Sequence, residues 1–564
     1  MKFIDYKYDR PDLVDIKGKT DKIFIEMQNA ENADKFLEGM EEFIKIRLHV
    51  ETMFTLGSIR HSIDTQDEFY DKESDYADMN MPLFQEIINS YYHTIIGSKY
   101  RSDIEEKYGK HLLNMAELSI KAFRPEIIED LQAENKLTSE YSKLVASANI
   151  MFQGEERNLS GLTPFMENPD RAVRKAAYEA YSGFFHDHES EFDRIYDELV
   201  HVRDKMAKKI GYENYVKMSY DGLLRTEYGP EEVKTYRKAI EENIVPLVMK
   251  LREKQARRLG LPELKYYDEA IEFTTGNAVP KGTPEWIIEN GKKMYSELSG
   301  ETKEFFDFMT EHGLLDLVNK KGKQAGGYCT YIPEYKSPFI FSNFNGTSGD
   351  IDVLTHEAGH AFQVYSSREY EVPEYNFPTY EACEIHSMSM EFFTWPWMEL
   401  FFKEDTKKYH FSHLQGTLLF LPYGVTVDEF QHFVYENPDA TPEERKSMWR
   451  EIEKKYLPLK NYDDNDFYER GGFWFKQLHI FTSPFYYIDY TLAQVCALQF
   501  WIRNEKEGKK AWDDYVKLCK EGGSKPFLEL VKVAGLNSPF VKETIPSILP
   551  DIEAYLDSVD DTKL

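Results

Sequence analysis

The fold and chemistry of this chain are most directly predicted from one stretch, Gly346-Thr-Ser-Gly-Asp350-Ile-Asp352-Val-Leu-Thr-His356-Glu357-Ala-Gly-His360. Serine and threonine in a turn bounded by glycines can cap a helix, and the two aspartates that follow suit the positive end of its dipole. The stretch therefore predicts an α-helix. Because an α-helix has 3.6 residues per turn, His356 and His360 lie on the same side of it, and both imidazoles can reach one metal ion.

Glu357 lies about 100° around this helix from His356, so its carboxylate stands beside the metal and not on it. A zinc hydrolase needs two neutral nitrogen ligands, one further ligand, an open position for water and a carboxylate that takes the water's proton. The spacing of these three residues fits that need. Because the same pattern also arises by chance, the hypothesis of a zinc site must also be tested by the presence of a third ligand.

A second predicted helix, beginning near Glu381, carries three carboxylates that can supply this ligand. Glu384 and Glu391 are seven residues apart on one face, with Glu381 nearby. One of them completes a zinc site of two histidines and a glutamate, although three glutamates can also form a solvated face without metal. Asp352, one turn before His356, is interpreted as a surface residue that stabilises the helix dipole, in preference to a group that orients the imidazole.

Length and charge restrict the class of protein. A chain of 564 residues exceeds one ordinary core, so we expect an N-terminal helical lobe over 1–165 and a catalytic region over 166–564, with the next helix capped at Asn168-Pro169. The formal charge of −30 and the lack of a basic cluster argue against nucleic acid or an anionic membrane as partner. No apolar run is long enough to span a bilayer and no signal sequence begins the chain, so a cytoplasmic location is expected.

Two short segments before the metal helix predict strands. Residues 326–332 and 338–344 are aromatic and β-branched, and a proline-containing turn separates them. The open edge of such a pair can hold an extended peptide by backbone hydrogen bonds, which makes Gly327, Tyr328 and Cys329 candidates for substrate binding. A purely structural ribbon explains the pattern equally well.

A second unusual stretch lies further along the chain. It reads His479-Ile-Phe-Thr-Ser-Pro484-Phe-Tyr486-Tyr487-Ile-Asp-Tyr490. Pro484 suits the first turn of a helix capped by Thr482 or Ser483, and on that helix two of the tyrosines, Tyr486 and Tyr490, share a face. Taken alone, such tyrosines are more often amphipathic residues at the edge of a core than catalytic groups.

Together, the histidine pair, the segment from Glu384 to Glu391 and the segment from His479 to Tyr490 resemble the thimet oligopeptidase superfamily, most closely its oligoendopeptidase F and Pz-peptidase branch. The likeness covers roughly residues 168–549. It implies a mainly α fold in which two helical lobes surround a deep channel for short peptides, here with a small β-sheet next to the zinc helix. Short peptides are therefore the expected partners.

The resemblance also implies roles for individual residues. It implies one Zn²⁺ per chain held by His356, His360 and Glu384, with Glu357 as general base, and His479, Tyr486 and Tyr490 as hydrogen-bond donors to the substrate and to the developing oxyanion. Matching the last motif to longer members of the superfamily requires a gap of one residue. Either Tyr486 or Tyr487 therefore fills the second tyrosine position, and Tyr487 is also a candidate for substrate binding.

The sequence thus predicts a zinc metalloendopeptidase, an oligopeptidase that hydrolyses internal bonds of short peptides. The nearest alternative is a zinc metallocarboxypeptidase on a similar helical body, which needs a cation for the terminal carboxylate of its substrate. The sequence alone assigns no such cation. The other alternative is a non-catalytic helical protein that binds peptides and carries the histidine motif by chance. Cleavage preference and oligomeric state are not predicted.

Overall fold

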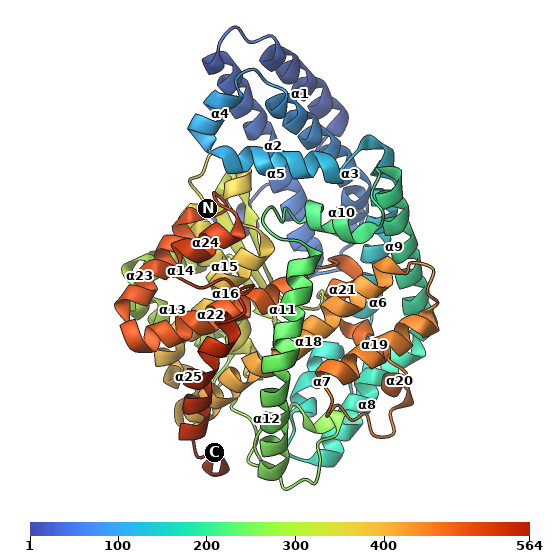
Figure 1. Ribbon diagram of the computed structural model, residues 1–564, viewed down its shortest axis with the longest axis vertical. Coiled ribbons are helices and arrows are strands. Elements are labelled where there is room, and N and C mark those ends of the chain that lie inside the picture. The colour runs from blue at the N-terminus through green and yellow to red at the C-terminus, as the bar shows by residue number, and fades with distance from the viewer.

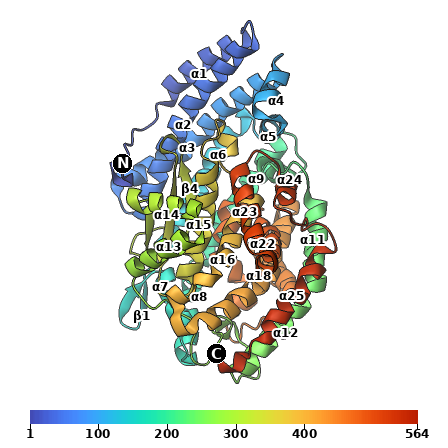
Figure 2. The same ribbon diagram turned by 90° about the vertical axis from the view of Figure 1, so that its left-hand side faces the viewer.

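The computed structural model describes residues 1–564 and shows a mainly helical chain, with 71% of residues in helices and two small sheets of two and three strands (Figure 1). The predicted fold class is confirmed. The first five helices project as one end of an elongated molecule, and the remaining helices form the larger body below it (Figures 1 and 2). No helix in the chain combines the length and the apolar character needed to cross a membrane.

The N-terminal end has a hydrophobic core of its own. Its helices are α1 (Leu13–Gln28), α2 (Ala33–Ile63), α3 (Glu68–Ile96), α4 (Arg101–Tyr108) and α5 (Lys110–Ala122). Their apolar faces bury a cluster of 26 residues, separate from the cluster of 104 residues in the body. Tyr375, from a loop of the body, enters the smaller cluster, where its hydroxyl donates to the carbonyl of Tyr108 and accepts from the N–H of Leu112. The two regions are therefore joined by buried contacts.

The middle of the chain is mostly helical. Its elements are α6 (Ile128–Ala146), β1 (Ile150–Phe152), β2 (Glu155–Arg157), α7 (Leu159–Met166), α8 (Arg171–Asp187), α9 (Glu189–Lys209), α10 (Tyr215–Gly222), α11 (Pro230–Asn243), α12 (Val245–Arg258), α13 (Pro284–Leu298) and α14 (Gly300–His312). The expected start of a helix at Asn168-Pro169 is wrong by two residues, because Asp170 caps α8 by accepting from the N–H of Ala172. The lobe boundary at residue 165 stays a prediction.

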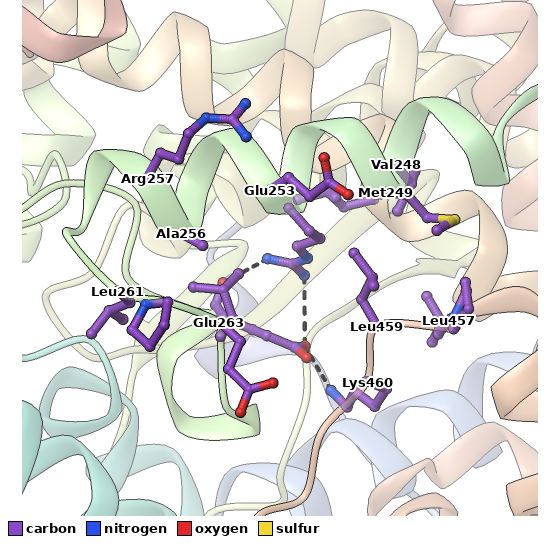
Figure 3. A pocket seen from close by; sticks show the side chains of 16 residues that line it. Val248, Met249, Glu253, Ala256, Arg257, Leu261, Glu263, Leu457, Leu459 and Lys460 are labelled. Atoms are coloured by element: carbon purple, nitrogen blue, oxygen red, sulfur yellow. Dashed lines mark hydrogen bonds and ion pairs between the residues drawn. The ribbon is translucent and has the colours of Figure 1, made fainter.

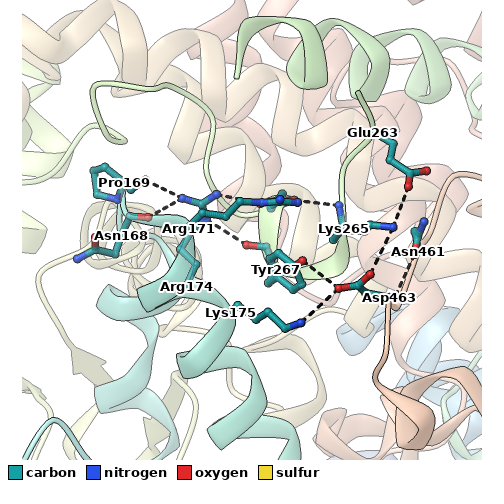
Figure 4. A network of polar contacts seen from close by, with 11 residues as sticks. Asn168, Pro169, Arg171, Arg174, Lys175, Glu263, Lys265, Tyr267, Asn461 and Asp463 are labelled. Carbon is teal, nitrogen blue, oxygen red and sulfur yellow. Dashed lines mark hydrogen bonds and ion pairs between the residues drawn. The ribbon is translucent and has the colours of Figure 1, made fainter. Parts of the chain in front are cut away.

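A loop that leads to the second motif is fixed from two sides. On one side, Lys460 donates to Glu269 at 2.7 Å (Figure 3). On the other side, Asp463 accepts from the hydroxyl of Tyr267 at 3.0 Å (Figure 4). Tyr267 adjoins Asp268, a fully buried carboxylate that accepts from the two arginines of the first turn of α8. These bonds hold the loop against α8 and against the segment 266–269 that follows α12.

The larger sheet stands beside the predicted metal helix. Its strands are β3 (Leu315–Val318), β4 (Tyr328–Ile332) and β5 (Ser337–Phe344), in the order β3-β5-β4. The predicted hairpin is confirmed as β4 and β5, which pair antiparallel with Cys329 opposite Ile340, although β4 begins two residues later than expected. The parallel strand β3 is not apparent from the sequence. Because β4 pairs only with β5, it is an edge strand of this sheet.

The last part of the chain supplies the helices around the candidate site. They are α15 (Gly349–Ser367), α16 (Tyr380–Phe393), α17 (Glu399–Phe402), α18 (Thr406–Glu436), α19 (Pro442–Tyr456), α20 (Asp466–Glu469), α21 (Leu478–Thr482), α22 (Tyr487–Glu507), α23 (Lys509–Glu521), α24 (Phe527–Val533) and α25 (Thr544–Ser558). The predicted helix around His356 is confirmed as α15. Helix α16 lies against both α15 and α22, so these three helices form the centre of the body.

Gly359, inside the histidine motif, sets the distance between α15 and α16. A Cβ atom at this position would lie 2.6 Å from the carbonyl oxygen of His386 on α16, which no real side chain tolerates. Glycine therefore allows the two helix backbones to approach closely. This approach brings Glu384, on the facing side of α16, to the two histidines of α15.

Candidate metal centre

Three side chains from α15 and α16 converge on one point. The Nε2 atoms of His356 and His360 lie 3.2 and 3.3 Å from the same oxygen of Glu384, Oε2, and the three ligand atoms all lie within 4.8 Å of one another. Tetrahedral ligand atoms about 2.0–2.1 Å from zinc are separated by about 3.3 Å. The donor set of two imidazoles and one carboxylate, and its spacing, therefore fit a zinc ion.

Glu391 lies outside the group of candidate ligand atoms but bonds one of the candidate histidines. Its Oε1 lies 2.7 Å from Nδ1 of His356, and its Oε2 lies 2.8 Å from Nε2 of His413 on α18. Burial alone would raise the pKa of Glu391, but its bonds to the two histidines lower it, so the carboxylate is ionised. An ionised acceptor at Nδ1 keeps the proton on that nitrogen and leaves Nε2 of His356 free for metal.

The structure corrects the interpretation of Asp352 as a surface residue. Asp352 is half-buried and accepts a hydrogen bond of 2.7 Å from the hydroxyl of Tyr409, and burial raises its pKa to about 6. The cause is α18, which covers this side of α15. Glu381, the third candidate on α16, accepts from the hydroxyl of Tyr228 at 3.0 Å and lies outside the group of ligand atoms.

Glu357 stands next to this centre with one oxygen unpaired. The residue is 6% exposed, and its Oε2 is buried without a hydrogen-bond partner. Burial is the main reason that the pKa of this carboxyl is raised. A Cβ atom at Gly327 would lie 3.6 Å from the other oxygen of Glu357, so the chain just before β4 passes directly beside the carboxylate.

The three strand candidates divide between the two sides of the sheet. Gly327 adjoins Glu357, and burial, followed by the charge of Glu357, raises the pKa of the Cys329 thiol. The ring of Tyr328 instead stacks on Phe341, with 4.8 Å between centroids and 10° between planes. Side chains alternate along a strand, so Tyr328 points away from the centre while Cys329 faces it.

The second motif is organised differently from the prediction. Helix α22 begins at Tyr487, and neither Thr482 nor Ser483 caps it, so the expectation that Pro484 lies in its first turn is wrong. The reason is Phe485, which has φ +66° in the preceding turn. Its N–H donates to Gln431 at 2.8 Å, and its carbonyl accepts from Arg225 at 2.6 Å.

This turn directs the two adjacent tyrosines to different neighbours. The hydroxyl of Tyr486 donates to Oε1 of Glu384, the carboxylate of the metal centre. Arg225, which holds the turn, also donates to Asp489 on α22 at 2.7 Å. The ring of Tyr487 makes an edge contact with His479, with 5.1 Å between centroids.

His479 and Tyr490 form a directed pair of donors. The side-chain amide of Gln477 donates to Nδ1 of His479 at 2.9 Å, which leaves the proton on Nε2, 3.1 Å from the hydroxyl of Tyr490. Burial lowers the pKa of His479 to about 4, so the ring is neutral near pH 7. Because His479 donates to the oxygen of Tyr490, the phenolic hydrogen remains available for another acceptor.

A cavity of about 550 Å³ adjoins these groups. Its wall includes Met388, Glu391, His413, Gln477, His479, Tyr487 and Tyr490. The structure thus brings the second motif to the same cavity as Glu391, the carboxylate that holds a histidine of the metal centre. A concave site with a few converging polar groups is typical of a small-ligand or peptide site.

Four residues of this site are absent from the sequence-based set of catalytic groups. The sequence gives Glu391 only as one of three candidate carboxylates on its helix, and it gives no indication of His413, Gln477 or Arg225. The spacing of Glu391 seven residues after Glu384 is a signal that it shares the face of the ligand. Arg225 and His413 bond residues that are distant in the sequence, and Gln477, although only two residues before His479, belongs to no recognisable pattern.

Comparisons with known proteins agree with the geometry. A model of the Peptidase M3 N-terminal domain matches residues 3–123, and a model of Peptidase family M3 matches residues 164–277 and 294–548. Oligopeptidase PepF of Bacillus subtilis (strain 168) is 24% identical over 590 residues, covering 98% of this chain and 83% of that protein. An Oligoendopeptidase F homolog of Lactococcus lactis subsp. lactis (strain IL1403) is 23% identical over 545 residues, covering 90% and 87%. The solved structure of Pz peptidase A with inhibitor 2 is 59% identical, with a TM-score of 0.99 and full coverage of both chains.

Proposed function

The chain belongs to the oligoendopeptidase F branch of peptidase family M3, and on this premise we propose that it is a zinc-dependent endopeptidase that hydrolyses internal bonds of short peptides. One observation carries the proposal. Two histidine Nε2 atoms lie 3.2 and 3.3 Å from one oxygen of Glu384, the separation of tetrahedral zinc ligands, beside a buried carboxylate, Glu357, that has one oxygen unpaired. A metal-dependent hydrolase needs this combination, whereas a helical scaffold does not.

His356, His360 and Glu384 would hold the zinc ion. When bound, zinc supplies Lewis-acid chemistry: it makes water more acidic and polarises the carbonyl of the peptide. Glu391 keeps the tautomer of His356 that a ligand requires, and Tyr486 restrains Glu384 through its hydroxyl. One ion per chain follows from this single set of ligands.

Glu357 is the proposed general base. Its unpaired oxygen is free to accept a proton from the attacking water, and its raised pKa makes it a stronger base than an exposed glutamate. The same carboxyl then delivers that proton to the leaving nitrogen of the cleaved bond. Its burial among protein atoms limits competition from bulk water for this proton.

Tyr490 is the proposed donor to the oxygen that becomes negative during attack. Its hydroxyl hydrogen is not used within the protein, since the hydroxyl oxygen accepts from neutral His479. A donor that is already in position stabilises the negative charge of the transition state more than it stabilises the carbonyl of the bound substrate. Its contribution therefore appears mainly in kcat.

The edge of β4 and the 550 Å³ cavity are the proposed peptide site. An extended substrate can pair with the edge strand near Gly327 and Cys329, and Tyr487 lines the cavity. Pairing with an edge strand requires an extended segment, which a short peptide offers and a folded protein keeps within its own structure, so short peptides are the proposed substrates. The cytoplasmic location stays a prediction.

A digest of mixed short peptides, analysed by mass spectrometry with and without a zinc chelator, tests the function. We expect cuts at internal bonds that stop with the chelator and return when zinc is restored. Peptides amidated at the C-terminus separate the alternatives, because an endopeptidase still cuts them and a carboxypeptidase does not. Intact peptides under all conditions would refute the proposal and favour a protein that only binds peptides.

A further inference from the structure

Helices α18 and α22 supply much of the wall of the 550 Å³ cavity beside the metal centre. On α22, the cavity-lining residues Tyr487, Tyr490 and Gln494 follow one another at intervals of three and four residues, which places them on one face of the helix. On α18, Ser412 and Gly416 line the same cavity, four residues apart. The two tyrosines belong to the second motif, whereas the proposed function gives no role to Gln494, Ser412 or Gly416.

Gln494 has a buried side chain that makes no hydrogen bond within the protein. The residue is 4% exposed, and its Nε2 atom is buried without a partner. Gln499 on the same helix shows the usual arrangement, because its buried amide donates to the carbonyl of Asn537 at 3.0 Å and accepts from the N–H of Asn537 at 2.8 Å. The Oγ atom of Ser412, on α18, is also buried without a partner. Since buried polar groups are nearly always paired, the free amide of Gln494 indicates a partner that enters the cavity.

Gly416 leaves open space in the cavity. It lies in the interior of α18, and it is exposed although both of its neighbours, Gln415 and Thr417, are buried. A Cβ atom at Gly416 would meet no atom within 4 Å, so packing within the protein does not require glycine here. Glycine inside a helix is also less favourable than alanine. The feature that glycine provides at this point is therefore the open space itself.

Gln494 lies within reach of the residues next to the cut bond. It follows Tyr490 by one helical turn, about 6 Å along the axis of α22. Tyr490 is the proposed donor to the carbonyl oxygen of the cut bond, and both residues line the cavity. An extended peptide advances about 3.3–3.6 Å per residue, so one turn of α22 corresponds to one or two residues of the substrate.

We propose that Gln494 is a specificity-determining residue: its side chain binds an amide group of the substrate within one or two residues of the cut bond, in the space that Gly416 leaves open. This inference rests on the proposed peptidase function. A carboxamide offers two N–H donors and one carbonyl acceptor, and an amide group of the substrate complements it with one bond of each kind. That group comes either from a glutamine or asparagine side chain or from the main chain of the peptide.

The groups around the cavity favour a neutral amide over a carboxylate. Glu391 and Asp352 both line the cavity, and no lysine or arginine does. His413, the nearest basic group in the wall, is bonded to Glu391 at 2.8 Å. A carboxylate of the substrate would therefore lie among acidic groups without a free cation, whereas an amide of the same shape carries no charge. Glutamine should bind in preference to glutamate at this position.

Binding measurements test the inference independently of turnover. Zinc-loaded Glu357→Gln protein, with and without Gln494→Met, is titrated with one short labelled peptide in which each position in turn carries glutamine or methionine. Methionine resembles glutamine in length but has no amide. We expect glutamine at one position to bind about tenfold more tightly than methionine, and this preference to disappear in Gln494→Met. If the main chain is the source of the amide, an ester in place of one peptide bond weakens binding instead, again only where Gln494 is present.

Gln499→Met is the matched control on the same helix. It should lower the melting temperature, because two bonds to Asn537 are lost, and leave the binding ratios unchanged. Gln494→Met should keep the parental melting temperature, because the amide that it removes has no partner within the protein. Equal ratios with and without Gln494, in both the glutamine and the ester series, would overturn the inference even where the parent protein cleaves peptides. A parent protein that cleaves no peptide refutes the proposed function instead.

Gly416→Leu tests whether the substrate enters the open space. Its Cβ atom meets no neighbour, so the variant should fold, and its side chain should weaken binding of the glutamine peptide more than binding of a peptide with glycine at the same position. Gly18→Leu is the control, because a Cβ atom at Gly18, inside α1, also meets no atom within 4 Å, and this variant should bind both peptides as the parent does. Parental binding of the glutamine peptide by Gly416→Leu would place the substrate elsewhere and overturn the inference.

Discussion

Replacement of Glu391 by alanine should weaken zinc binding about 10- to 100-fold without removing a ligand. Glu391 accepts from Nδ1 of His356 at 2.7 Å and from His413 at 2.8 Å. A hydrogen bond to a charged group contributes about 1.5–3 kcal/mol, and only the bond to His356 acts directly on the metal. That range corresponds to roughly 10- to 100-fold in the dissociation constant, since about 1.4 kcal/mol is tenfold.

The assay is a competition with a chelator that buffers free zinc, and it measures the concentration at which half of the sites are filled. The zinc affinity of Glu391→Gln should lie between those of the parent and Glu391→Ala, because an amide oxygen still accepts from Nδ1 but carries no negative charge. Glu384→Ala, which loses a ligand, should bind zinc far more weakly than either variant. Parental affinity in Glu391→Ala would refute the role given to this carboxylate, and an equal loss in Glu391→Ala and Glu384→Ala would make Glu391 a ligand.

Three further predictions follow from other parts of the structure. Glu357→Gln should retain zinc near the parental content while losing most turnover, so joint loss of metal and activity would contradict its role as base. Tyr490→Phe should lower kcat by roughly two orders of magnitude with little change in KM and with zinc retained, and a parental kcat in this variant would contradict the role of Tyr490 as donor. Tyr486→Phe should instead weaken zinc binding, because the hydroxyl of Tyr486 holds Glu384. Burial lowers the pKa of His111 to about 4. Below about pH 6.5 this histidine is therefore protonated in the unfolded chain but not in the folded chain, and the free energy of unfolding falls as the pH drops from 6.5 towards 4. Between pH 7.5 and 5, the free energy of unfolding of the parent should therefore fall by about 2 kcal/mol more than that of His111→Leu. An equal fall in the two proteins would contradict the lowered pKa of His111.

The positions predicted correctly from the sequence are those that depend on the periodicity of a single helix. The spacing of His356 and His360 determines their common face on a helix, and Glu384 follows on the next helix. Each inference needs only neighbours within one or two turns. Gly359 extends this reasoning, because a small residue inside the motif permits the close approach of α16 that brings the third carboxylate to the histidines.

Long-range packing accounts for the errors. Asp352 follows the rule for an exposed first turn, but α18 covers it and Tyr409 bonds its carboxylate. Pro484 fits the first turn of a helix, yet Arg225 and Gln431 hold the following residue in a left-handed conformation and delay the helix to Tyr487. In both places a contact from a segment distant in the sequence overrides the local preference. A pattern of neighbouring residues carries no information about such a contact.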